Sequence, residues 1–281
     1  MFHATAMAVS YEAVLDPLQR LFGCRVLHDN EAPTPGIERR GGMTWIGDNS
    51  IEIGEPLGPT SPVRRFLDRF GGGMHSVAVQ VADVDAALER ASALGVRTAD
   101  RPQPGVAFTR PGDTAGLLFE WFSNHQGDDP RWGHALPPFT VEPVVDVRHV
   151  AFVGAIVEDP AAAAEHLGRV LDTGVTTYSA GGPADAPRAG VDLGDCTLAL
   201  YPMPSPGESK TVWGRDHERP RCLSLGLVVD DLVAAAAALA AEGHHVHHRT
   251  DEGHLILDDT QLPFPVVLTD RLLAGDRRTT A

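Results

Sequence analysis

The order of apolar and polar residues repeats along the chain. Segment 75–96 (HSVAVQVADVDAALERASALGV) and segment 223–244 (LSLGLVVDDLVAAAAALAAEGH) each hold an apolar run, an Asp, an Ala-rich stretch and a Gly. Apolar residues of the first stretch fall at helical spacing, at Val84, Ala87, Leu88 and Ala91. Gly95 and Gly243 stand where glycine ends a helix. Each segment therefore predicts a strand followed by a helix.

Three further pairs of segments correspond between the halves of the chain. They are WIGDNSIEIGEP (45–56) with VDLGDCTLALYP (191–202), LLFEWF (117–122) with FPVVLTD (264–270), and the strand from His3 with the strand from His149. The chain thus predicts four units that start near His3, His75, His149 and Leu223. In each, one strand and one helix precede two or three short strands separated by Gly and Pro. We predict an α+β fold of four βαβββ units.

A stretch rich in Pro, Gly and charged residues separates the two pairs of units. It reads NHQGDDPRWGHALPPFTVEP (124–143), a composition typical of a domain connector. We expect a first domain over 1–124, a linker over 125–146 and a second domain over 147–275.

Composition narrows the classes of function. The 281 residues carry a formal net charge of -15, which disfavours nucleic acid and anionic membranes as partners. Cys24, Cys196 and Cys222 are too widely spaced for a disulfide framework or a metal knuckle. No apolar run approaches ~20 residues, and the N-terminus lacks the pattern of a signal peptide. We expect a cytoplasmic protein, a monomer or homodimer, with a small-molecule substrate.

The repeat also separates shared residues from residues present in only one half. Three charged or polar residues inside apolar strands of the first half correspond to apolar residues in the second half. The pairs are His75 with Leu223, Glu52 with Ala199 and Glu120 with Leu268. Only His3 has a polar counterpart, His149. A carboxylate in an apolar strand is costly unless it is paired, binds a cation or points into water. Two His and two Glu together favour a metal site in the first half.

The first half resembles the vicinal oxygen chelate superfamily, and within it methylmalonyl-CoA epimerases. The matching stretch runs from His3 to about Phe122 and includes GDNSIEIGEPLGPTSPVRRFL (47–67), GGGMHSVAVQVADVDAALERASALGV (71–96) and GLLFEW (116–121). The resemblance implies curved mixed sheets and metal ligands at His3, Glu52, His75 and Glu120, a set similar to that of bacterial glyoxalase I. The second half resembles the superfamily only in its scaffold.

One departure from the epimerases concerns the catalytic base. Their Glu in the segment corresponding to 33–36 is replaced by Thr34, which does not take up a proton near neutral pH. We therefore expect a metal-ligand carboxylate, Glu52 or Glu120, to act as the base. Trp45, Phe108 and Trp121 are candidate walls of the substrate pocket.

This donor set suits one divalent ion, Mn, Co, Ni, Fe or Zn. We expect a metal-dependent epimerase or isomerase that removes a proton next to a carbonyl through a metal-stabilised enediolate. Its substrate would carry vicinal oxygens, as a keto-sugar, cyclitol, hydroxyketone or acyl thioester does. Two alternatives stay open: an extradiol-type dioxygenase, and a non-catalytic binding or resistance protein.

Overall fold

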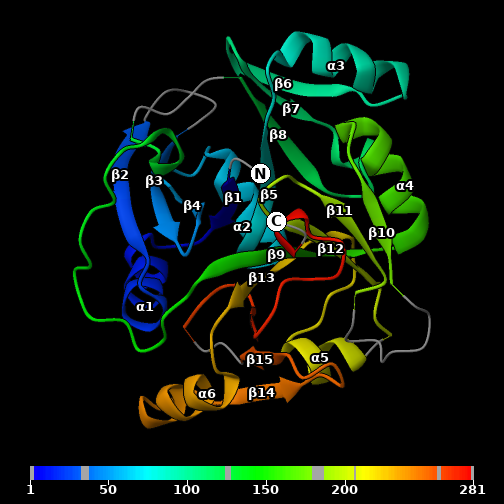
Figure 1. Cartoon of the computed structure of the whole chain (residues 1–281). Coiled ribbons are helices and arrows are strands. Elements are labelled where there is room, and N and C mark those ends of the chain that lie inside the picture. The colour runs from blue at the N-terminus through cyan, green and yellow to red at the C-terminus, as the bar shows by residue number, and fades with distance from the viewer. Residues whose placement is uncertain are drawn as a thin grey trace.

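The protein folds into two sheets of eight strands each. The structure is a computed structural model, and it describes residues 3–32, 38–123, 128–178, 187–205, 207–257 and 261–279. The strand order is β2-β3-β4-β1-β5-β8-β7-β6 in the first sheet and β10-β11-β12-β9-β13-β16-β15-β14 in the second. Figure 1 shows the two curved sheets with helices α1, α3, α4 and α6 on their outer sides.

Each sheet is built from two βαβββ units, as the sequence predicts. The first half comprises β1 (His3–Met7), α1 (Glu12–Phe22), β2 (Arg25–Ala32), β3 (Arg39–Ile46) and β4 (Asn49–Pro56), then β5 (Gly73–Gln80), α3 (Val84–Ala93), β6 (Thr98–Gln103), β7 (Val106–Thr109) and β8 (Leu118–Phe122). A further helix, α2 (Pro62–Phe70), connects its two units.

The second half follows the same plan. It comprises β9 (His149–Val157), α4 (Pro160–Leu171), β10 (Val175–Thr177), β11 (Ala189–Asp192) and β12 (Thr197–Pro202), then β13 (Arg221–Val228), α6 (Leu232–Ala241), β14 (Val246–Arg249), β15 (Leu255–Leu257) and β16 (Val266–Thr269). Helix α5 (Glu208–Trp213) connects its units, and short 3-10 turns occur at Pro111–Asp113, Pro130–Trp132 and Arg277–Thr279. The predicted α+β architecture of four units is confirmed.

The helix that follows the first strand of a unit begins in the same way in three of the four units. The carboxylates of Asp83, Asp159 and Asp231 each accept hydrogen bonds from two backbone N–H groups of the first turn. Such caps satisfy donors that have no partner inside the helix. Gly95 follows α3 with φ 84, a left-handed conformation that glycine adopts without strain.

Strand alternation gives each sheet one face for the helices and one inner face. In the first half, Ile51, Val77 and Trp121 join Leu18 of α1 and Leu88 of α3 in the main apolar core. The neighbouring residues along each strand point to the opposite face, because side chains alternate along a strand. His3 and Thr5 of β1, Glu52 of β4 and Glu120 of β8 therefore share the inner face.

Polar contacts tie the two halves together around Asp48, in the turn between β3 and β4. Its carboxylate accepts a hydrogen bond from the backbone N–H of Val150 at 2.9 Å and lies 2.7 Å from Nδ1 of His149. Arg278, near the C-terminal end of the described chain, donates to the same carboxylate at 2.9 Å. His149 thus acts in the contact between the halves.

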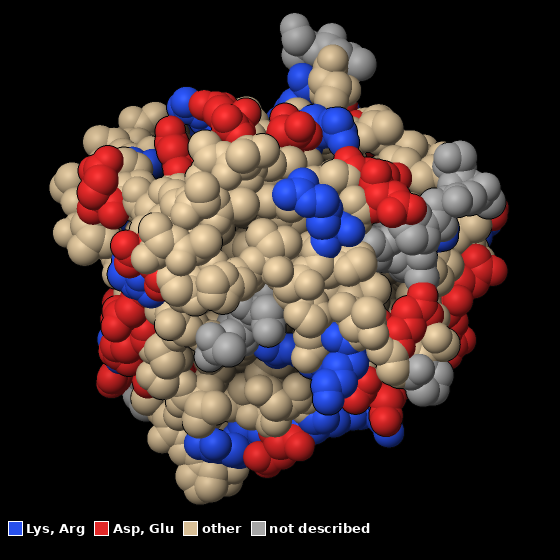
Figure 2. Space-filling model, turned by 90° about the horizontal axis from the view of Figure 1, so that it is seen from below, with Lys and Arg blue, Asp and Glu red and all other residues tan. Residues whose placement is uncertain are grey.

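The acidic balance of the chain is spread over its surface. On the face seen in Figure 2, Asp and Glu side chains gather mainly toward the left and right edges, whereas several Lys and Arg side chains lie near the middle and in the lower part. Among the described residues, no helix combines the length and the apolar character needed to cross a membrane.

Candidate metal centre

The registers of three neighbouring strands bring the predicted site residues together. Central strand β1 pairs with parallel β4, where Thr5 lies opposite Glu52, and with antiparallel β5, where His3 lies opposite Ala78. In turn, Ala78 lies opposite Glu120 on β8. Residues opposite one another point to the same face of a sheet, so all these side chains share the inner face.

Three of the predicted ligands form one buried group. One donor atom each of His3, Glu52 and Glu120 lies within 4.8 Å of the others. His3 Nε2 is 3.4 Å from Glu52 Oε2 and 3.5 Å from Glu120 Oε2. The residues are only 1%, 8% and 6% exposed, which makes two carboxylates costly unless a cation neutralises them. An imidazole and two carboxylates fit a borderline or hard divalent ion.

Arg39 is a member of the site that the sequence analysis did not include. Its Nη1 donates to Oε1 of Glu52 from the neighbouring strand β3. A Cβ at Gly41 would lie 3.0 Å from this Arg39 nitrogen and 3.5 Å from the Glu52 oxygen, so glycine leaves space for the ion pair. The contact depends on how β3 and β4 pair, which residue types along the sequence do not reveal.

The fourth predicted ligand, His75, lies outside the group. Thr5 pairs with Ser76 and Ala6 with Met74, so His75 is the extra residue of a β-bulge. Its Nδ1 is 3.1 Å from Ser76 Oγ. Strands β1 and β5 are the equivalent first strands of the two units. His3 of β1 lies opposite Ala78, and Ser76 of β5 lies opposite Thr5 in the same relation. Ser76, and not His75, is therefore the residue of β5 that corresponds to His3.

The environment of His75 keeps its imidazole neutral. Burial lowers the pKa of His75 to about 4. The nearby carboxylate of Glu52 opposes this shift, and the positive charges of Arg39 and Arg221 add to it. Its ring meets the ring of Phe66 edge-on, with centroids 4.7 Å apart.

Of the three aromatic residues predicted to line the substrate pocket, two lie on the inner face of the sheet and one does not. Phe108 lies opposite Glu120 on β7, and Trp45 lies opposite Ser50 on β3, so both face inward. Trp121 corrects the expectation, because it follows Glu120 directly and therefore points into the apolar core, where it is 0% exposed. Thr34 lies outside the described residues.

The surrounding charges shift the pKa values of the two carboxylates in opposite directions. Burial would lower the pKa of His3, but the carboxylates of Glu120 and Glu52 outweigh it and raise this pKa to about 9. Burial opposes ionisation of Glu52 as well, yet Arg39 and His3 lower its pKa. For Glu120 burial prevails over His3 and raises the pKa. Glu52 is thus fixed as a carboxylate, whereas Glu120 is the more basic of the two.

The family model described as the Glyoxalase/Bleomycin resistance/Dioxygenase superfamily matches residues 2–111. This part of the chain belongs to that superfamily. The ethylmalonyl-CoA/methylmalonyl-CoA epimerase of Cereibacter sphaeroides is 26% identical over 126 residues, which are 42% of this chain and 92% of that protein. The mitochondrial methylmalonyl-CoA epimerase of Mus musculus is 33% identical over 82 residues, 27% of this chain and 46% of that protein. The superfamily domain is thus related to epimerases.

One solved structure resembles the entire chain. A variant of 4-hydroxymandelate synthase from Streptomyces coelicolor matches with a TM-score of 0.70 and 15% identity, covering 100% of this chain and 95% of that one. At this identity the likeness shows the fold alone. It establishes that the superfamily domain and the second half together form a known two-domain arrangement.

We call His3, Glu52 and Glu120 the candidate metal group. The second half has apolar residues where the superfamily domain has this group. Phe152 pairs with Gly226 as His3 pairs with Ala78, so Phe152, and not His149 as expected, corresponds to His3. The register also corrects the counterpart of Glu120, which is Val267, because Gly226 pairs with Val267. The expected correspondence of Glu52 with Ala199 agrees with the register.

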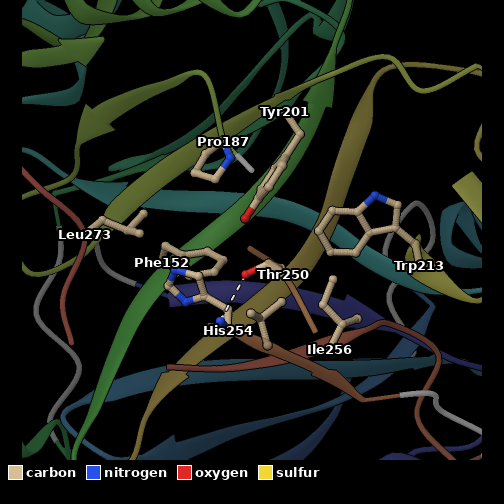
Figure 3. Close-up of a pocket in the computed structure, with 9 residues that line it drawn as sticks. Phe152, Pro187, Tyr201, Trp213, Thr250, His254, Ile256 and Leu273 are labelled. Carbon is tan, nitrogen blue, oxygen red and sulfur yellow. Dashed lines mark hydrogen bonds between the residues drawn. The ribbon is translucent and has the colours of Figure 1, made fainter. Parts of the chain in front are cut away.

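Aromatic side chains fill the inner face of the second half. Phe152, Tyr201 and Trp213 converge there, as Figure 3 shows, and belong to one buried apolar cluster. A Cβ at Gly226 would lie 2.4 Å from the Phe152 ring, so glycine makes space for this ring. The space left among these residues has a volume of only about 10 Å³. This half is therefore packed where the superfamily domain is polar.

We predict that Phe152→Ala destabilises the protein without affecting the candidate metal group. Removing a buried Phe leaves a cavity and lowers the free energy of unfolding by about 3–5 kcal/mol. Val233→Ala, on the exposed face of α6, is the control and should change it by less than about 0.5 kcal/mol. Denaturant titration measures both. Equal effects of the two variants would contradict the packing described for Phe152.

We predict that His3→Ala and Glu120→Ala each weaken Mn²⁺ binding more than about 100-fold, because each removes a ligand. His75→Ala should weaken it about tenfold or less, and His149→Ala should leave it unchanged. Isothermal titration measures the affinities, and circular dichroism verifies that each variant is folded. A loss at His75 equal to that at His3 would make His75 a fourth ligand, and a loss at His149 would refute the location of the site.

We predict that the metal-free protein becomes less stable as the pH rises from 6.5 to 9. The raised pKa of His3 stabilises the fold fully below the unfolded value of 6.5, and this contribution disappears as the pH passes about 9. The loss should not exceed about 3 kcal/mol. Thermal unfolding across this range measures it. His3→Ala is the control and should lack the dependence; the same slope in that variant would assign it to another group.

Proposed function

We propose that the superfamily domain binds one divalent metal ion through His3, Glu52 and Glu120 and acts as an isomerase on the carbon next to a carbonyl. The observation that carries this proposal is the buried group of one imidazole and two carboxylates within 4.8 Å on the inner face. A bound divalent ion would stabilise the negative charge that develops on the substrate oxygens when that carbon loses its proton. The relationship to epimerases supports the same reaction class.

The residues of the group divide the remaining tasks. Arg39 holds Glu52 in an ion pair and so keeps this carboxylate in place, which makes it a poor proton acceptor. In the metal-free protein burial raises the pKa of Glu120, so it is the better proton acceptor of the two carboxylates. We assign proton removal and return to Glu120, with Phe108 beside it as a wall that limits access of water.

The donor set distinguishes this proposal from a dioxygenase. Non-haem Fe(II) oxygenases use two His and one carboxylate with open positions. The group found among the described residues has the reverse composition, one His and two carboxylates. Carboxylate-rich sites suit Mn²⁺ and similar ions, so the proposal favours isomerisation over oxygen chemistry.

The proposal also names a substrate class for a first test. Relatives of the superfamily domain are named for methylmalonyl-CoA and ethylmalonyl-CoA, which are acyl thioesters with an acidic hydrogen between two carbonyl groups. We propose acyl thioesters first, and keto-sugars, cyclitols and hydroxyketones after them.

We predict that the Mn²⁺-loaded protein incorporates deuterium from D2O at the carbon next to the carbonyl of such a substrate. Proton nuclear magnetic resonance follows the exchange of methylmalonyl-CoA, ethylmalonyl-CoA and a panel of hydroxyketones. At Mn²⁺ concentrations that saturate both proteins, Glu120→Gln should still slow the exchange by about 10²- to 10⁴-fold, because it removes the base. Glu89→Gln, on the exposed side of α3, is the matched control and should leave the rate unchanged.

Two results would reject the isomerase. One is the absence of exchange with every substrate class when metal binding is intact. The other is consumption of oxygen by the Fe²⁺-loaded protein with a catechol or a 2-keto acid, measured with an oxygen electrode, which would favour the dioxygenase. Glu120→Gln at the wild-type rate would reject only the role of that residue.

A further inference from the structure

A cavity of about 530 Å³ lies between the two halves. Its lining comes from α2, β5, the turn before β8 and the segment that leads into β13. Leu118 lines it and precedes Glu120 by two residues on the same face of β8, a distance of about 7 Å along a strand. A molecule that touches Leu118 in this cavity would therefore lie one inward-facing position along β8 from Glu120.

Arg221 enters this cavity from the second half. Its Nη2 donates to the carbonyl of Gly72 at 3.0 Å, and its guanidinium lies 5.1 Å from the ring of Phe70. Within the described chain it forms no ion pair with a carboxylate. The side chain is partly removed from water, and this burial lowers its pKa. Such a charge is costly until an anion balances it.

Two further guanidinium groups line the same cavity. Arg69 comes from α2 and Arg219 from the segment before β13. No Asp or Glu is among the described residues that line this cavity, although the chain as a whole has a net charge of -15. The rest of the lining is mainly apolar and includes Phe66 and Phe70. The lining thus combines positive charge with aromatic surface.

A buried histidine beside these arginines supplies an independent observation. His217 lines an adjoining cavity of about 290 Å³ that shares Arg69, Arg219 and Arg221 with the first. It is only 7% exposed, and neither ring nitrogen has a hydrogen-bond partner in the described part of the chain. Buried polar atoms are almost always hydrogen-bonded, so this imidazole points to a ligand. Asp216 and Glu218 also line this second cavity, where three arginines outnumber them.

We propose that Arg221 and Arg219 of the second half, with Arg69 and His217, bind an anionic group of the substrate, a carboxylate or a phosphate carried on an apolar body. Guanidinium groups bind both anions through paired hydrogen bonds. The aromatic rings of Phe66 and Phe70 pack against the apolar body. The position of the substrate's reacting end at Glu120 rests on the proposed function, whereas anion binding in this cavity does not.

The test uses three small probes and the metal-free protein with both halves, so that no metal ion binds the probes. The probes are 3-phenylpropionate, phenyl phosphate and the neutral 3-phenylpropanol, and isothermal titration measures their affinities. We expect at least one anion to bind more than about tenfold more tightly than the alcohol. The tighter of the two anions identifies the group as a carboxylate or a phosphate.

Arg221→Gln should weaken binding of the preferred anion about 10- to 100-fold, because a charged hydrogen-bond donor is removed. Arg219→Gln should also weaken binding of the preferred anion. This variant keeps the contact of Arg221 with Gly72, so it still tests the site if Arg221→Gln misfolds. The matched control is Arg65→Gln, an exposed charge on the same helix as Arg69, which should bind within about twofold of wild type.

Three results would overturn this proposal: no binding of either anion, equal binding of the anions and the alcohol, or wild-type affinity in both Arg219→Gln and Arg221→Gln. The measurement needs no turnover. A protein that binds the anion but exchanges no deuterium would therefore support the anion site and reject the isomerase. A protein that exchanges deuterium but binds neither anion would support the isomerase and reject the anion site.

Discussion

The inner face of the first sheet depends on the balance of charge around two buried carboxylates. Glu52 and Glu120 are almost fully enclosed, and two such charges within a few ångströms repel each other and lose hydration. His3 lies between them, and Arg39 contacts Glu52 from outside. The imidazole can neutralise the pair only when protonated. A divalent ion bound as proposed would therefore compete with that proton for the same place.

The second half shows the other way to complete this fold. At the corresponding positions a ring replaces the imidazole, and apolar side chains replace both carboxylates. Phe152 fits because Gly226 opposite it has no side chain, and Tyr201 and Trp213 occupy the remaining space. The scaffold thus tolerates either a polar or an apolar inner face. Chemistry in one half leaves the other free to contribute packing and substrate contacts.

The sequence predicted the architecture better than the detail of the site. Repeated patterns sufficed for the four units, since each carries its own strand, helix and glycine signals. Glu52 and Glu120 were identifiable because a carboxylate inside an apolar strand is unusual. Trp121 could also have been placed correctly, since it follows Glu120 and strand alternation puts neighbours on opposite faces. The bulge at His75 and the pairing that brings Arg39 to Glu52 depend on register, which residue type does not encode.

The anion site proposed between the halves gives the covalent duplication a physical role. The superfamily domain supplies the carboxylates, which repel an anionic substrate, while Arg219 and Arg221 come from the second half. The two kinds of charge must lie close together without neutralising each other. Separate elements achieve this, because the first sheet fixes the carboxylates around His3, while Arg221 at the start of β13 contacts Gly72 and the Phe70 ring. With both proposals, a substrate that bridges the two halves would meet positive charge at one end and Glu120, the proposed base, at the other.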